Sequence, residues 1–211
     1  MKSRVKYELE GKKLPSLSTV LDNCKIGGIG NLIYRAKKDG FAGKDTTRPD
    51  LCAFESIKAI MREGHVELDE EYSDSCIDKA DPAICDAVDW IDKNKVSIKI
   101  KDLSLVSDSL FFGHTFDLYN FGGDTTLVQI VNQSEIYPEN LIKLAACRSL
   151  LDNNDLASSD TAYILRVYLG SDGKAALEVH EYDDSCLEQA AIALAQIMKL
   201  YTTQEKLKCM L

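Results

Sequence analysis

The sequence predicts an α/β fold in which helices flank a mixed central sheet and the N-terminal half is mostly helical. The first observation is a change of periodicity near residue 96, where apolar and polar residues begin to alternate. The second is a helical pattern that lies between two of the later strand patterns. With 211 residues, the chain suits one domain, 1–211, with a mainly helical part at 1–95 and a sheet core at 96–211.

Three segments organise the N-terminal half. The stretch 7–21, "YELEGKKLPSLSTVL", predicts a short hairpin or strand that leads into a helix after Pro15 and Ser16. Residues 51–62 predict a second helix, with apolar residues spaced for one buried side. A further helix is expected through 84–91, which carries Trp90.

Strand patterns dominate the C-terminal half. Five stretches alternate or are rich in β-forming residues: 96–109, 110–121, 125–133, 162–170 and 175–183. Turn signals such as Gly122-Gly123 and Asp172-Gly173 separate them. Helices are predicted at 138–154, where Pro138 suits a first helical position, and at 185–208. The first of these helices would lie between two strands of the series, and the second would follow the last strand.

Composition narrows the class of protein. The chain is 45% hydrophobic and 28% charged, which is typical of globular proteins. No apolar segment approaches the roughly 20 residues that span a bilayer, so we expect a cytoplasmic protein without membrane contact. The net charge of −9 argues against a broad basic surface that binds duplexes nonspecifically. A small basic groove within an acidic surface is still compatible with this charge.

Local motifs add little chemistry. The seven cysteines include no CxxC pair, which favours free thiols in a reducing compartment. The "GGIG" at 27–30 does not fit a phosphate-binding glycine pattern, and basic residues follow it at Arg35, Lys37 and Lys38. The acidic stretch 66–81 lacks the glycine and terminal glutamate of a calcium loop. We therefore expect a helix start with a basic face at the glycine stretch, and a solvated loop or helix edge at the acidic stretch.

Three stretches carry a resemblance to a known family. They are 7–21, the segment "LVSDSLFFGHTFDLY" with Gly113, Thr115 and Asp117, and the helix "IYPENLIKLAAC". In this order they resemble the RecB-like branch of the PD-(D/E)XK nucleases, which includes phage recombination exonucleases and the mitochondrial genome maintenance exonuclease. The resemblance covers nearly the whole chain and implies a restriction-endonuclease-like fold acting in DNA recombination or processing.

The resemblance also implies a site. In that family one or two magnesium ions are held by strand carboxylates, and a strand lysine assists the attacking water. Asp117 matches the first strand acid, and Asp102 is a candidate for an upstream acid, so these two are the implied metal ligands. Gln129 stands where the second acid would be and Val131 where the lysine would be. Because glutamine carries no charge and valine transfers no proton, the site resembles that of a pseudoenzyme.

Residues on or near the helix predicted at 138–154 could replace the missing acid and lysine. Lys143 stands where the family has a glutamine, Cys147 where it has a tyrosine, and Lys143 could replace the missing lysine. Glu135 or Glu139 could supply a displaced acid, although glutamates near a helix start are usually exposed or interact with the helix dipole. The candidate catalytic set is therefore Asp102, Asp117, Gln129 and Lys143.

Histidines add no clear ligand. The family's helix histidine has no counterpart, because Ile60 holds its place and His65 lies past the helix end. His114 and His180 are compatible with metal ligands, but their strand positions favour sheet or cleft surface.

Three functions remain. The favoured one is a nuclease-fold protein without catalysis, serving as a nucleic-acid-processing accessory or a protein-interaction module, with DNA or a DNA-processing protein as partner and no cofactor. The second is a magnesium-dependent DNA exonuclease with displaced ligands. The third is an acidic interaction or inhibitory protein that does not contact nucleic acid.

Overall fold

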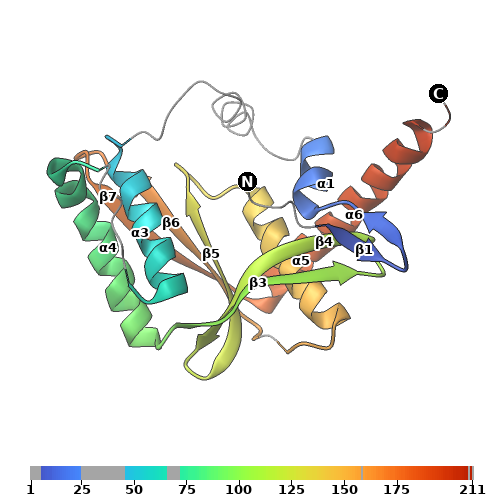
Figure 1. Cartoon of the computed structure of the whole chain (residues 1–211), viewed down its shortest axis with the longest axis horizontal. Coiled ribbons are helices and arrows are strands. Elements are labelled where there is room, and N and C mark those ends of the chain that lie inside the picture. Colours follow the sequence, from blue (N-terminus) through green and yellow to red (C-terminus); the bar gives the residue numbers. More distant parts are fainter. Residues whose placement is uncertain (1–5, 25–45, 66–71, 158, 209, 211) are drawn as a thin grey trace.

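A five-stranded mixed sheet separates the helices into two groups (Figure 1). The computed structural model describes residues 6–24, 46–65, 72–157, 159–208 and 210. The strands are β3 (Ser97–Ser107), β4 (Phe112–Phe121), β5 (Asp124–Asn132), β6 (Ala162–Leu169) and β7 (Ala175–Tyr182), in that spatial order. Only β5 and β6 are parallel, because α5 (Pro138–Asn153) joins them as a crossover. The predicted mixed α/β architecture is confirmed.

Helices α3 (Pro49–Glu63) and α4 (Asp74–Asn94) cover one face of the sheet. Pro49 occupies a first-turn position of α3, and Gly64 ends the helix in the left-handed conformation, with φ 76°. Trp90 of α4 packs edge-on against Tyr163, which in turn stacks on Phe121 at 4.7 Å between ring centroids. These two helices therefore pack directly against the sheet.

The opposite face is covered by α5, with α6 (Asp184–Lys208) and α1 (Leu17–Asn23) packed around it. Leu144, Cys147 and Leu151 of α5 contact the buried side chains of β5 and β6 on this face. Ser16 caps α1 by accepting a hydrogen bond from the Thr19 amide at 3.2 Å. The parallel strands β5 and β6 are thus covered on both faces, as is typical of parallel pairs.

A short hairpin, β1 (Tyr7–Leu9) and β2 (Lys12–Leu14), lies against β4. Gly113 permits this contact, because a Cβ atom there would lie 2.1 Å from Cγ of Tyr7. The Tyr7 hydroxyl is hydrogen-bonded to Thr115 at 2.8 Å, and the Gly113 amide donates to Pro15 O at 3.0 Å. The hairpin is fastened to the same strand that carries the candidate site.

The predicted strands and the helices of the described segments are confirmed, mostly with small differences in their ends. The exception is the helix expected through 84–91, which begins at Asp74 because Ser73 caps it there and accepts a hydrogen bond from the Cys76 amide. The "GGIG" stretch, Arg35, Lys37 and Lys38 lie outside the described residues, as does the first part of the acidic stretch, 66–71. Within the segments that the structure describes, no helix is long and apolar enough to cross a membrane.

Candidate functional site

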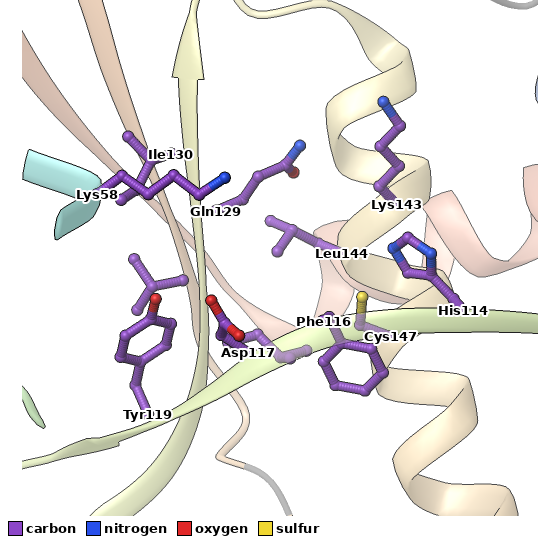
Figure 2. Close-up of a pocket in the computed structure, with 12 residues that line it drawn as sticks. Lys58, His114, Phe116, Asp117, Tyr119, Gln129, Ile130, Lys143, Leu144 and Cys147 are labelled. Carbon is purple, nitrogen blue, oxygen red and sulfur yellow. The ribbon is translucent and has the colours of Figure 1, made fainter. Parts of the chain in front are cut away.

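Strands β4 and β5 separate soon after the turn that joins them. They pair at Phe121–Asp124, Asn120–Thr125 and Tyr119–Thr126, and no further pairs follow among the described residues. A pocket of about 170 Å³ lies where they diverge, between α3 on one side and α5 on the other (Figure 2). The geometry of the sheet therefore produces a recess beside the candidate residues.

Four residues singled out by the resemblance line this pocket: Asp117 from β4, Gln129 from β5, and Lys143 and Cys147 from α5. Asp117 and Gln129 lie on neighbouring strands, as the sequence predicts. Asp102 does not line the pocket but reaches Asp117 through its backbone, since its amide donates to Asp117 Oδ1 at 2.9 Å. Asp117 and Gln129 thus border one pocket from neighbouring strands, and Asp102 contacts Asp117 from outside it.

The strand register differs by one residue from the alignment inferred from the sequence. Tyr119 pairs with Thr126 and shares its face, so Asp117 points toward the α3 face, where Val128 and Ile130 also pack. Gln129 alternates onto the α5 face. The β5 side chains on the face of Asp117 are therefore Val128 and Ile130, neither of which can hold a metal or transfer a proton.

Val131 also belongs to the α5 face. It is only 6% exposed and packs in the core beneath α5, rather than beside Asp117. Side chains two residues apart on a strand share a face, so Val131 lies on the face of Gln129.

An arginine bridges the two candidate metal ligands. Arg62, near the end of α3, places Nη2 2.8 Å from Asp102 Oδ2 and Nε 3.0 Å from Asp117 Oδ2. Burial alone would lower the pKa of Arg62, but the charges of Asp117 and Asp102 outweigh burial and raise it. The guanidinium therefore stays charged and occupies the space between the two carboxylates.

Asp102 reaches Arg62 because β3 is irregular at this point. The register shifts between Ile100 and Leu103, and Asp102 has a φ of 51°. A non-glycine residue in this conformation is strained, and such strain persists where surrounding contacts compensate for it. The hydrogen bond to Asp117 and the ion pair to Arg62 supply those contacts.

Each residue of the Gly113–Thr115–Asp117 motif has a structural contact of its own. Gly113 makes room for Tyr7, Thr115 is hydrogen-bonded to Tyr7 and to Ser104, and Asp117 is paired with Arg62. The motif is therefore accounted for by packing and ion pairing.

The α5 side of the pocket is cationic at its rim and apolar within. Lys143 is paired with Glu139 at 2.6 Å. Burial, and then the charge of Lys143, lowers the pKa of His114 to about 4, so this imidazole is neutral at neutral pH. Burial raises the pKa of the Cys147 thiol, which makes it a poor nucleophile.

The residues present do not fit a magnesium site. Both candidate carboxylates are bonded to Arg62, while Gln129 lies on the other face and Glu139 is paired with Lys143. Glu135 is exposed and does not line the pocket. In the described segments, no group of three or more His, Cys, Asp or Glu residues is arranged to hold a metal ion.

The remaining histidines do not join the site. His180 lies on β7 and its Nε2 is 3.1 Å from Glu178, which also pairs with Arg166. His65 lies beyond the end of α3, as expected, and contacts the Glu63 carbonyl oxygen at 3.0 Å.

Two residues of the site were missed by sequence reasoning: Arg62 and Lys58, both on α3. Lys58 lines the pocket opposite Lys143 (Figure 2). Both are basic residues on a helix with one apolar side, and their spacing of four places them one turn apart. The sequence shows that spacing, but it does not show which strand the helix faces.

Comparisons with known proteins give little more. No model of a protein family matches the chain, and no curated protein is significantly similar to it. A solved structure described as LHK-Exo in complex with dAMP aligns at 12% identity and a TM-score of 0.32, covering 57% of this chain and 65% of that chain. The aligned part is thus less than two thirds of that protein, and a similarity of this size assigns no function.

Proposed function

We propose that this chain is a nuclease-fold protein without hydrolytic activity, which serves as a non-catalytic accessory module in nucleic-acid processing. The observation that carries the proposal is the Arg62 guanidinium, held between the carboxylates of Asp102 and Asp117. These are the two groups that the family resemblance assigns to the metal.

Electrostatics supports this reading. A hard dication needs several oxygen ligands with substantial negative charge, and here a fixed positive charge already lies about 3 Å from two of them. Like charges at such separations repel strongly where the surroundings are partly buried. Arg62 is 23% exposed and Asp117 is 17% exposed, so solvent screens the pair only in part.

The neighbouring strand offers no compensation. Val128 and Ile130 face the side of Asp117, so both the second acid and the lysine of the family pattern are absent from β5. A residue from another element could replace either the acid or the lysine alone. The absence of both, together with a bound arginine, favours a site that no longer uses a metal.

A second candidate rests on Lys58. Its ammonium group lines the pocket near Asp117, where a displaced catalytic lysine would be useful. The alternative is a magnesium-dependent deoxyribonuclease in which Arg62 moves away when metal and DNA bind.

A cleavage assay separates the two. Linear and single-stranded DNA are incubated with Mg²⁺ or Mn²⁺ and with wild type, Asp117→Asn, Lys58→Met and Arg62→Gln proteins. We expect equal, background-level degradation by all four. Because contaminating nuclease is the main hazard, only activity lost in Asp117→Asn or Lys58→Met counts, and a loss of about 100-fold would establish the deoxyribonuclease instead.

Metal affinity provides an independent measurement. Calorimetric titration of the wild-type protein with Mn²⁺ should give no heat of specific binding. Arg62→Gln removes the competing cation and is the variant in which a weak site would emerge. Wild-type binding that disappears in Asp117→Asn would contradict the proposal.

A further inference from the structure

The two edges of the central sheet differ in how they are protected. β3 forms one edge, and its pairing with β4 is interrupted by register shifts on both sides of Ile100. It also carries two exposed lysines, Lys99 and Lys101. Register shifts and lysines both hinder an edge strand from pairing with another chain. β3 is therefore a poor edge for association.

β7 forms the opposite edge of the sheet and has none of these features (Figure 1). All eight of its residues, Ala175–Tyr182, pair with β6 without a register shift, and the strand contains no proline or lysine. Within the described part of the chain, no other strand pairs with its outer edge. Such an edge presents a row of backbone N–H and C=O groups to which a further strand can be added.

Side-chain contacts hold this edge in one conformation. Arg166 of β6 pairs with Glu178 at 2.6 Å, and the Tyr168 hydroxyl donates to the same carboxylate at 3.0 Å. The Arg166 guanidinium also lies over the Tyr168 ring, 3.9 Å from its centroid. A strand that is already ordered loses little conformational freedom when it binds, so β7 is preorganised for pairing.

The sequence of β7 is complementary to itself in one antiparallel register. When Val179 lies opposite its own copy, Glu178 of each chain lies opposite His180 of the other. Val179 is an apolar side chain that is 37% exposed, and the second copy would cover it. The register therefore combines an apolar centre with a polar pair on each side.

Other symmetric registers are less favourable. Centring the pair on Glu178 or Glu181 would place like charges directly opposite one another. Centring it on His180 would place Val179 opposite Glu181, and centring it on Leu177 would place Glu178 opposite an alanine. Val179 is thus the centre that the side chains select.

We propose that two copies of this chain associate through β7, antiparallel and about a two-fold axis at Val179, so that two five-stranded sheets become one continuous sheet. Backbone hydrogen bonds supply the affinity, and the Glu178–His180 pairs fix the register. The proposal is independent of the proposed function, because no residue of β7 lines the pocket beside Asp117.

Charge sets the conditions for association. Each chain carries a net charge of −9, so two copies repel one another at long range. At about 0.15 M salt, this repulsion is screened beyond about 8 Å. A single strand pair is also a small interface, so we expect a weak dimer, with a dissociation constant of about 100 μM or lower.

Sedimentation equilibrium of the full chain at this salt concentration tests the dimer. Val179→Lys places two like charges together at the two-fold axis and should weaken association by about tenfold or more. Ile100→Lys is the matched control, because Ile100 lies on the other edge strand and is also 37% exposed. It should leave association unchanged.

Two results would overturn the proposal. One is a wild-type chain that stays monomeric up to about 500 μM. The other is an equal loss of association in Val179→Lys and Ile100→Lys. Thermal unfolding of both variants checks that they are folded, and cysteine cross-linking gives a second measurement that does not depend on Val179→Lys.

Cross-linking tests the centre of the interface. Cys85 and Cys186 are exposed, so both are replaced by serine, together with Cys209. In this background Val179→Cys should form a disulfide-linked dimer on mild oxidation. Residues opposite one another in an antiparallel pair have Cα atoms about 4.5–5.5 Å apart, which a disulfide can span.

A mixture of two variants tests the register. Leu177→Cys and Glu181→Cys should cross-link to each other when mixed, since these positions lie opposite one another when Val179 is the centre. Neither should cross-link by itself. Cross-linking of Leu177→Cys alone at the rate of the mixture would refute this register, and dimers without any of these cross-links would refute β7 as the interface.

Discussion

Each end of α3 carries an aspartate–arginine pair that contacts the sheet, and the two pairs differ in their surroundings. At the N-terminal end, Asp50 is 2% exposed and accepts a hydrogen bond from Arg48 Nε at 3.1 Å. Asn132 of β5 donates to its Oδ2 at 2.9 Å. Burial would raise the pKa of Asp50, but hydrogen bonds from Arg48 and Asn132 hold it below its ordinary value.

At the C-terminal end, the roles are reversed. Here the arginine is on the helix, and two aspartates come from separate strands. Arg62 Nε lies within ion-pair distance of Asp117 but is buried without a well-aligned hydrogen bond among the described residues. The first pair is a closed structural junction, whereas the second lies beside a pocket and retains unsatisfied hydrogen-bonding capacity. Ion pairs of the same chemical type can therefore lie in a closed core at one end of a helix and beside a pocket at the other.

Removal of the buried aspartate should have the largest effect. Asp50→Ala deletes a buried charge together with its hydrogen bonds, and should lower the free energy of unfolding by on the order of 3 kcal/mol. Urea denaturation measures the change, with Asp50→Asn as the variant of matched shape. If Asp50→Ala is no more destabilising than Arg62→Gln, the junction at the N-terminal end is not the stronger one.

Acid should act on the pocket before it acts on Asp50. The pKa of His114 is lowered in the folded state to about 4, so the unfolded chain binds more protons below about pH 6.5 and stability falls from there toward pH 4. The loss should be on the order of 2 kcal/mol, since His114 is partly exposed. Asp50 is a carboxylate with a lowered pKa, so its contribution to stability is lost only as pH falls below the ordinary carboxyl range.

Unfolding curves across this pH range check the order. The variant His114→Gln should flatten the dependence between pH 6.5 and 4 while preserving the loss at lower pH. A wild-type protein of constant stability down to pH 4 would show that His114 is protonated in the folded state.

Removal of the bridging arginine should have a smaller effect. Arg62→Gln leaves Asp117 with the Asp102 amide as a donor, and should cost about 1.5 kcal/mol. Thermal unfolding with and without Mn²⁺ sharpens the comparison, because a cation can stabilise only the variant in which the carboxylates are released. Equal stabilisation of wild type by Mn²⁺ would mean that Arg62 does not block the site.

The smallest effect is expected next to this bridge. Lys101 and Glu63 form an ion pair at 2.5 Å, but both side chains are well exposed, at 41% and 51%. Exposed pairs contribute little because water screens them and two long side chains lose freedom. Lys101→Met should therefore leave the urea midpoint unchanged, and a clear shift would show that the pair supports Arg62.

Much of the fold was predictable because strong local patterns specify it. The alternation through β3, β4 and β5 and the proline at the start of α5 gave elements whose ends differ little from the structure. The side of β5 that faces Asp117 was not predictable, since a shift of one residue exchanges Gln129 for Val128 and moves every side chain to the other face. The ion pairs of Arg62 depend on the strained backbone of Asp102 in an irregular strand, and no local sequence pattern predicts that conformation.

The contact between Tyr7 and the Gly113–Thr115 segment has a consequence for folding during synthesis. Tyr7 and Thr115 are separated by 108 residues, so the hairpin leaves the ribosome well before its docking surface exists. Contacts between such distant residues form slowly, because loop closure must precede any stabilising gain. While α3 and α4 are being made, Tyr7 remains without its final partner, and a side chain at Gly113 would prevent docking even after β4 is complete. The glycine therefore decides whether the hairpin can dock once β4 is complete.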